Sequence, residues 1–124
     1  ATLTTDLDRF TAWYQQVFGA ELVFAMDAAG DHPRMHILDM GGGAALNVFE
    51  VTAEAMIGDQ RRLGRRGAID HYGIAVPSRA DLDAVHQRLV DAGADIGEIQ
   101  KLGDVWSLFF RDVDGMELEV CAPL

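Results

Sequence analysis

Histidine, carboxylate and thiol side chains gather in two short segments of the second half of the chain. His71 opens one segment, and Glu117, Glu119 and Cys121 alternate with apolar residues in the other. Alternate side chains of a strand point to opposite faces, so Glu117, Glu119 and Cys121 share one face. Burying two carboxylates on one face costs free energy unless a cation or a bound ligand compensates their charge. Imidazole and carboxylate groups are also ligands of divalent metals, so these residue types suggest a metal or ligand site.

The segments at residues 71–76 and 106–111 show a similar division into two faces. One face of the first segment is apolar and suits packing under a helix, whereas the other carries His71 and otherwise only small side chains. The second segment alternates Trp106, Leu108 and Phe110 with Ser107, Phe109 and Arg111. A sheet with one apolar face and one small or polar face predicts a concave ligand site.

An internal repeat supplies the elements that must position these residues. Two helix-start signals, at residues 5–8 and 78–81, each place a hydroxyl three residues before a carboxylate. Apolar residues at helical spacing follow each signal, and each predicted helix ends at a glycine, Gly19 or Gly93. The signals lie 73 residues apart and the glycines 74. The chain therefore contains one structural unit twice.

Each half is predicted to run strand, helix, strand, strand, strand. Glycine and aspartate occupy the breaks between the strands, as they do in turns. The predicted strands are 1–4, 22–26, 34–40 and 44–51 in the first half and 71–76, 98–102, 106–111 and 116–121 in the second.

We expect a single domain of residues 1–124, with a first module at 1–51, a connector at 52–70 and a second module at 71–124. The connector carries four of the ten basic residues. We interpret them as part of a solvated linker in preference to an anion-binding site; they are Arg61, Arg62, Arg65 and Arg66.

The composition excludes several classes of function. The 124 residues include 20 acidic and 10 basic side chains, so the formal charge is -10. This charge opposes binding to nucleic acid or to an anionic membrane. No apolar run approaches the roughly 20 residues that span a bilayer, and the single cysteine cannot form an internal disulfide. We expect a cytoplasmic protein that binds a small molecule, and neither nucleic acid nor membrane.

The duplicated order of elements resembles the vicinal oxygen chelate (VOC) superfamily, which includes glyoxalase I, ring-cleaving dioxygenases, epimerases and bleomycin- or fosfomycin-resistance proteins. The segments that carry the resemblance are 5–21, 41–48, 71–76, 110–115 and 117–120. The resemblance implies an α+β fold, in which two tandem βαβββ modules form a cup-shaped, partly closed mixed sheet with the helices outside. It implies a fold more strongly than a reaction, since one scaffold supports several chemistries.

The resemblance also implies where a metal would bind. Metal-using relatives take one ligand from the first strand of each module and one from the fourth strand, four residues after the turn glycine. In the second module these positions are His71 and Glu119, counted from Gly115. Both are suitable ligands for a divalent cation, and they share a face by alternation.

The first module offers weaker ligands at the equivalent positions. Counting from Gly43 gives Asn47, a poorer ligand than a carboxylate, while Glu50 is predicted to face the opposite side. Matching Leu3 to Ile74 places the partner of His71 just before Ala1. A histidine at that position would be a third ligand, whereas an initiator methionine would supply none. His36 lies in the middle of a predicted strand and is a weaker candidate.

Two functions are favoured at this point, and a structural or regulatory domain that only keeps the fold is a third possibility. The first is an enzyme in which a divalent metal (Zn, Ni, Mn, Fe or Mg), held by His71 and Glu119, chelates a small oxygenated substrate for lyase, isomerase or dioxygenase chemistry. Glu119 would then be part of the catalytic centre, and Glu117 or a water would move the proton. The second is a metal-free protein that sequesters a cationic antibiotic of the bleomycin type, which the charge of -10 would attract.

Both functions use the same predicted binding residues and the same assembly. The candidates for contact with the substrate or antibiotic are Asn47, Phe49, Trp106, Phe109 and Arg111. By analogy with the family, we expect a homodimer.

Overall fold

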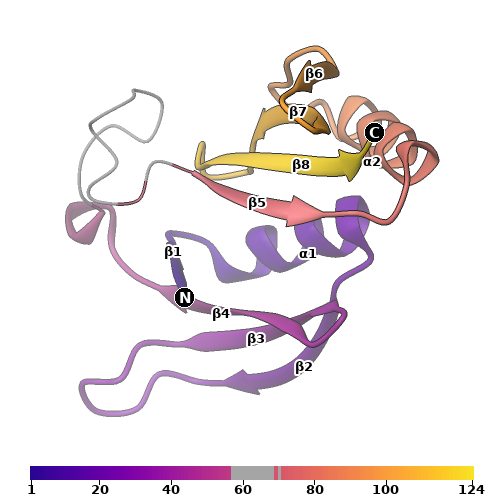
Figure 1. Ribbon diagram of the computed structural model, residues 1–124. Helices are drawn as coiled ribbons and strands as arrows, with labels where there is room; N and C mark the ends of the chain where they lie inside the picture. Colours follow the sequence, from indigo (N-terminus) through magenta and orange to yellow (C-terminus); the bar gives the residue numbers. More distant parts are fainter. Residues whose placement is uncertain (57–68, 70) are drawn as a thin grey trace. The chain divides into compact units, whose positions relative to one another are not determined.

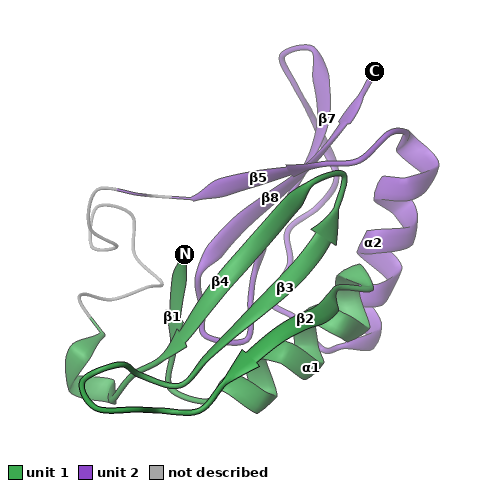
Figure 2. Ribbon diagram, turned by 90° about the horizontal axis from the view of Figure 1, so that it is seen from below, with its two compact units in different colours: residues 1–57 green, residues 58–124 purple. Residues whose placement is uncertain are grey.

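The computed structural model describes residues 1–56, 69 and 71–124. The chain divides into two compact units, Ala1–Ile57 and Gly58–Leu124, which we call unit 1 and unit 2 (Figure 2). Each unit has its own helix and its own four-stranded sheet (Figure 1). The four arginines of the predicted linker lie outside the described residues.

Unit 1 follows the predicted order of strand, helix and three strands. Its elements are β1 (Thr2–Thr4), α1 (Leu7–Phe18), β2 (Glu21–Met26), β3 (Met35–Gly41) and β4 (Ala44–Glu50), followed by a 3-10 turn, η1 (Ala53–Ala55). The strands lie in the order β1-β4-β3-β2. β1 is parallel to β4, and the other neighbours are antiparallel.

Unit 2 repeats this arrangement. Its elements are β5 (Tyr72–Ala75), α2 (Arg79–Asp91), β6 (Gln100–Leu102), β7 (Val105–Arg111) and β8 (Glu117–Pro123). The sheet order β5-β8-β7-β6 is the counterpart of the order in unit 1, and β5 is again parallel to its neighbour. The predicted α+β fold of two tandem βαβββ modules is confirmed, and neither described sheet closes into a barrel.

Both helices begin at a capping side chain. In α2 the hydroxyl of Ser78 accepts a hydrogen bond of 3.2 Å from the Asp81 amide, as predicted. In α1 the cap is Asp6, whose carboxylate accepts a bond of 2.9 Å from the Arg9 amide. The hydroxyl of Thr5 was the expected cap, but Thr5 lies one residue too early, because Asp6 is the extended residue before the first helical turn.

Each helix packs its apolar stripe against its own sheet. In α1 this stripe includes Phe10 and Val17, and in α2 it includes Leu82 and Leu89, all of which are fully buried. Complete burial of such a side chain contributes about 1.5–3 kcal/mol. The facing sheet residues are also buried: Leu38 and Val48 in unit 1, and Leu108, Phe110, Leu118 and Val120 in unit 2. Neither helix of the described chain has the length and hydrophobicity that a membrane crossing requires.

Candidate functional site

Unit 2 gathers the predicted site residues on the face of its sheet that points away from α2. Leu118 and Val120 are fully buried under α2, so Glu119 between them points to the opposite face. Glu117 and Cys121 share that orientation, as the alternation predicts. Strand pairing adds further residues to this side, which we call the polar face: Gly73 and Phe109 pair with Glu119, Arg111 with Glu117, and Ser107 with Cys121.

Glu119 lies between two polar side chains on the polar face. The hydroxyl of Ser107 donates a hydrogen bond of 2.5 Å to Oε1 of Glu119. The second carboxylate oxygen, Oε2, lies 3.8 Å from Nε2 of His71. The side chain of Glu119 is 14% exposed and that of His71 is 35% exposed, so both can be reached from solvent. The structure thus brings together the histidine and the carboxylate that the sequence analysis paired.

Ser107 was not among the predicted site residues. Its sequence signal was its alternation with Trp106 and Leu108, which placed it on the same face as Phe109. Its bond to Glu119 depends on how β7 and β8 align, and the pattern of either strand alone does not contain that alignment.

An aromatic ring and a glycine border the His71–Glu119 pair. The ring of Phe109 meets the imidazole of His71 edge to face, with centroids 5.3 Å apart. A β-carbon at Gly73 would lie 3.9 Å from both Oε2 of Glu119 and Sγ of Cys121. The glycine therefore keeps the space beside Oε2 free of a side chain, while Phe109 covers one side of the imidazole.

The thiol of Cys121 lies beside the carboxylate of Glu119 on the polar face. Burial raises the pKa of Cys121 to about 11, and a hydrogen bond and charge repulsion from Glu119 act in the same direction. A thiol with this pKa stays protonated, and the thiolate is the form that attacks electrophiles and binds metals. The raised pKa therefore indicates a protonated thiol that packs beside Glu119.

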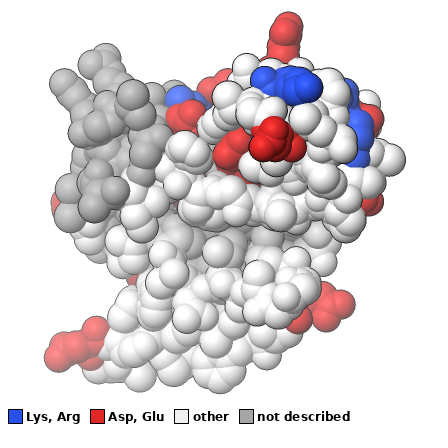
Figure 3. Space-filling model, in the orientation of Figure 1, with Lys and Arg blue, Asp and Glu red and all other residues white. Residues whose placement is uncertain are grey.

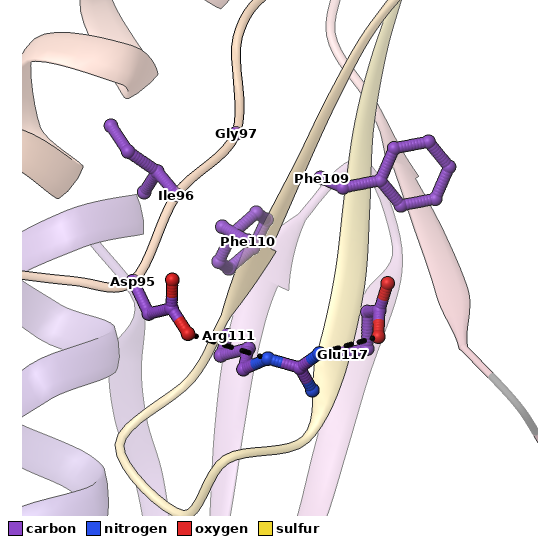
Figure 4. Close-up of a pocket in the computed structure, with 7 residues that line it drawn as sticks. All are labelled: Asp95, Ile96, Gly97, Phe109, Phe110, Arg111 and Glu117. Atoms are coloured by element: carbon purple, nitrogen blue, oxygen red, sulfur yellow. Dashed lines mark ion pairs between the residues drawn. The ribbon is translucent and has the colours of Figure 1, made fainter. Parts of the chain in front are cut away.

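Arg111 and Glu117 lie beside a cavity of about 220 Å³ (Figure 4). Nη2 of Arg111 is 3.2 Å from Oε2 of Glu117, and Nε is 3.4 Å from Oδ2 of Asp95. The guanidinium is thus held between two carboxylates. The sequence analysis missed Asp95, because its contact with β7 depends on the path of the segment after α2. That segment runs along β7 through hydrogen bonds such as Arg111 N–H to the Asp95 carbonyl, 2.8 Å.

Trp106 lies on the other face of β7, apart from the polar face. The guanidinium carbon of Arg79, in the first turn of α2, lies 4.4 Å from the centroid of its ring. This is a cation–π contact between the helix and the sheet. The structure therefore brings Phe109 to His71 and Glu119, but it does not bring Trp106 there.

Asn47 and Phe49 belong to unit 1 and share one face of β4. Val48 between them is fully buried on the helix side, so both side chains point away from α1. Asn47 is exposed, and the ring of Phe49 lies 5.9 Å from the ring of His32. They occupy the positions of their module that correspond to Glu119 and Cys121 in unit 2.

Glu50 and His36 face α1, so the structure gives them roles in the packing of the helix. Oε2 of Glu50 accepts a hydrogen bond of 2.8 Å from the Leu7 amide at the start of α1. His36 is buried, and its Nδ1 lies 2.7 Å from the hydroxyl of Thr11. Burial lowers the pKa of His36, and the charge of Arg34 lowers it further. The predicted orientation of Glu50 is confirmed.

The strand pairing shows that the first strands of the two modules correspond differently, by one residue, from the match made on the sequence. β1 pairs Thr2 with Val48, and β5 pairs Ile74 with Val120. Both valines lie five residues after the turn glycine of their module. Thr2 is therefore the equivalent of Ile74, in place of Leu3.

The orientation of the side chains agrees with this shift. Thr4 is fully buried on the helix side, while Leu3 is 41% exposed and points the other way. The position equivalent to His71 then falls two residues before Ala1, and not immediately before it.

His71 and Glu119 fit one part of a metal site. Two atoms that each bind one ion at about 2.1 Å can lie no more than about 4.2 Å apart, and the observed 3.8 Å satisfies this limit. Oε1 accepts the hydrogen bond of Ser107, the thiol of Cys121 also bonds the carboxylate, and Oε2 is the oxygen nearest Nε2 of His71. Within the described residues, no group of three or more His, Cys, Asp or Glu side chains could hold a metal.

Two βαβββ modules, one of which presents a histidine and a carboxylate on a sheet face, define a protein of the VOC fold class. The family model described as "Glyoxalase/Bleomycin resistance protein/Dioxygenase superfamily" matches residues 1–120. The chain belongs to this superfamily.

Solved structures resemble the chain over nearly its whole length. The glyoxylase/bleomycin resistance protein/dioxygenase domain from Frankia sp. EAN1pec is 27% identical with a TM-score of 0.85, over 99% of this chain and 93% of that chain. A mutant of the fosfomycin resistance protein FosX from Listeria monocytogenes, complexed with Mn(II) and 1S,2S-dihydroxypropylphosphonic acid, is 20% identical with a TM-score of 0.74, over 99% and 88%. Lactoylglutathione lyase from Agrobacterium tumefaciens is 21% identical with a TM-score of 0.69, over 98% and 90%. The last two show the fold alone. No curated protein matches the sequence.

Proposed function

We propose that this protein is a metal-dependent enzyme that acts on a small oxygenated molecule, with His71 and Glu119 as two ligands of a divalent cation. The observation that carries the proposal is the 3.8 Å separation of Nε2 and Oε2 on one sheet face. The fold shared with Mn(II)-bound FosX supports it. A third protein ligand is proposed at the position two residues before Ala1, which strand register makes the equivalent of His71.

Each residue of the polar face has a separate role in the proposed chemistry. His71 and Glu119 would hold a divalent ion such as Zn, Ni, Mn, Fe or Mg, which would supply Lewis-acid chemistry for a lyase, isomerase or dioxygenase reaction. Phe109 holds the plane of the His71 ring through the edge-to-face contact. Glu117 lies two residues before Glu119 on the same face and is proposed to move the proton. Arg111 holds the carboxylate of Glu117 in place.

Contacts with the substrate are proposed for residues on the sheet faces away from the helices. In unit 2 these are Phe109 and Arg111, and in unit 1 they are Asn47 and Phe49. Trp106 is left out, because its ring packs under Arg79 on the helix side.

Metal content is the test of this proposal. Elemental analysis of the purified full-length protein is expected to find about one metal ion per chain, and little in His71→Ala or Glu119→Gln. His86→Ala, which changes a histidine on α2, and Glu98→Gln are matched controls that should retain the metal. Equal metal in all variants, or none in the wild type after growth with each candidate metal, would contradict the proposal.

A second function is favoured by a specific observation. The described residues hold no group of three metal ligands, and the whole chain carries a formal charge of -10. Both suit a metal-free protein that sequesters a cationic antibiotic of the bleomycin type, drawn in by long-range attraction. This function predicts heat release when bleomycin is titrated into metal-free protein, and loss of that heat at high salt.

The proposed assembly is a homodimer in the cytoplasm, where a lone thiol remains reduced. The two units are proposed to act together as one domain of residues 1–124, with a small molecule as the only ligand besides the metal. Light scattering during size-exclusion chromatography tests the assembly, and the mass of a single chain would contradict it.

A further inference from the structure

Ser107 is a fully buried polar residue in the middle of β7. A buried hydroxyl is costly unless it forms a hydrogen bond. Its neighbours along the strand, Trp106 and Leu108, point to the helix side, so Ser107 is turned toward the polar face. There its hydroxyl donates to Oε1 of Glu119 at 2.5 Å, a charge-assisted bond across two strands.

This bond restricts the carboxylate of Glu119. The terminal torsion of a glutamate is broad, so an unrestrained carboxylate samples many orientations. With Oε1 held by Ser107, the other oxygen, Oε2, is the one directed to Nε2 of His71. The two oxygens of Glu119 therefore have different neighbours: Oε1 accepts a hydrogen bond from the hydroxyl of Ser107, and Oε2 faces His71.

We propose that Ser107 is a positioning residue that fixes Glu119 so that a divalent cation is bound through Oε2 alone. This inference rests on the proposed metal-dependent function and adds the residue that sets the geometry of the carboxylate ligand. Hydrogen bonds of this kind to ligating side chains orient them, and their loss typically lowers metal affinity about 10- to 100-fold.

The test is a titration of metal-free, full-length protein with Co²⁺, followed by calorimetry and by visible absorption. Ser107→Ala is expected to bind Co²⁺ about 10- to 100-fold more weakly than the wild type. Its absorption spectrum is expected to change, because the released carboxylate can bind through both oxygens. Ser107→Cys is nearly isosteric with a weaker donor, so its affinity should lie between the two.

The matched control is Ser78→Ala in the same unit. Ser78 also donates a 2.5 Å hydrogen bond to a carboxylate, that of Asp81, but at the start of α2. Its removal should destabilise the protein without changing Co²⁺ affinity or the spectrum, which separates a positioning effect from a loss of stability. Thermal melting of each metal-free variant reports whether it folds. If Ser107→Ala does not fold, the comparison is made with Ser107→Cys.

The outcomes distinguish this inference from the function on which it rests. If the wild type binds no Co²⁺, both the metal-dependent function and the positioning role are overturned. If the wild type binds Co²⁺ and folded Ser107→Ala or Ser107→Cys binds it equally well with the same spectrum, only the positioning role is overturned.

Discussion

Single residues of this protein owe their chemistry to neighbours that are distant in sequence. Glu119 was expected to pair with His71, and it does so at 3.8 Å, but its closer partner is Ser107. His36 shows the same effect in unit 1. Its Nδ1 lies 2.7 Å from the hydroxyl of Thr11 of α1, in the buried layer between helix and sheet. An imidazole in that layer is harder to protonate, which makes its state measurable through stability.

The free energy of unfolding should fall as the pH drops below about 6.5, the ordinary pKa of histidine. Burial, followed by the charge of Arg34, lowers the pKa of His36 in the native state. Below pH 6.5 the unfolded chain therefore binds a proton that the native state does not, until the native pKa is reached. Urea denaturation between pH 7.5 and pH 5 measures the effect.

His36→Gln should flatten this pH dependence, since glutamine does not titrate. The control is His32→Gln, which removes an exposed turn histidine and should leave the dependence unchanged. An equal pH dependence in the wild type and His36→Gln would contradict the assignment.

The secondary-structure elements were well predicted, because their signals are local. Both helices and all eight strands occur where periodicity and turn residues placed them, with ends that differ by a residue or two. The exception is the start of α1, where the cap is Asp6 in place of Thr5. Asp6 and Ser78 lie 72 residues apart, as do Thr2 and Ile74, so the caps and the first strands of the two modules correspond at the same offset.

Asp6→Ala should lower the free energy of unfolding by about 1 kcal/mol, because the Arg9 amide loses its acceptor. Thr5→Ala should change it by less than about 0.5 kcal/mol, since Thr5 is an exposed residue outside the helix. Urea denaturation of both variants makes the comparison. A larger loss in Thr5→Ala would show that the hydroxyl is the cap after all.

For the whole molecule, the dominant physical feature is the excess of negative charge. Basic side chains are half as numerous as acidic ones, 10 against 20. In the view of Figure 3, the acidic side chains lie at separate points of the surface, and few charged atoms cover the region formed by β2, β3 and β4. Leu22, Val23 and Phe24 of β2 are exposed apolar residues. The net charge of -10 gives the chain a net self-repulsion that salt can screen.

Salt should stabilise this protein by screening its self-repulsion. Raising NaCl from about 20 mM to about 500 mM shortens the Debye length several-fold, so the Tm is expected to rise by a few degrees. Thermal melting at both concentrations, repeated with KCl to exclude an effect of the particular cation, provides the measurement. A lower Tm at high salt would show that ion pairs such as Arg34–Asp8 outweigh the repulsion.

The sequence by itself determined the duplicated βαβββ order, the two faces of each strand and the pairing of His71 with Glu119. These features follow from short-range periodicity and from a match to a known family. Only the tertiary structure decided that Ser107 holds Oε1 of Glu119, that Arg111 lies between Glu117 and Asp95, and that Trp106 packs under Arg79. These contacts join residues on different elements, and their geometry depends on strand register and helix packing, which no local pattern encodes.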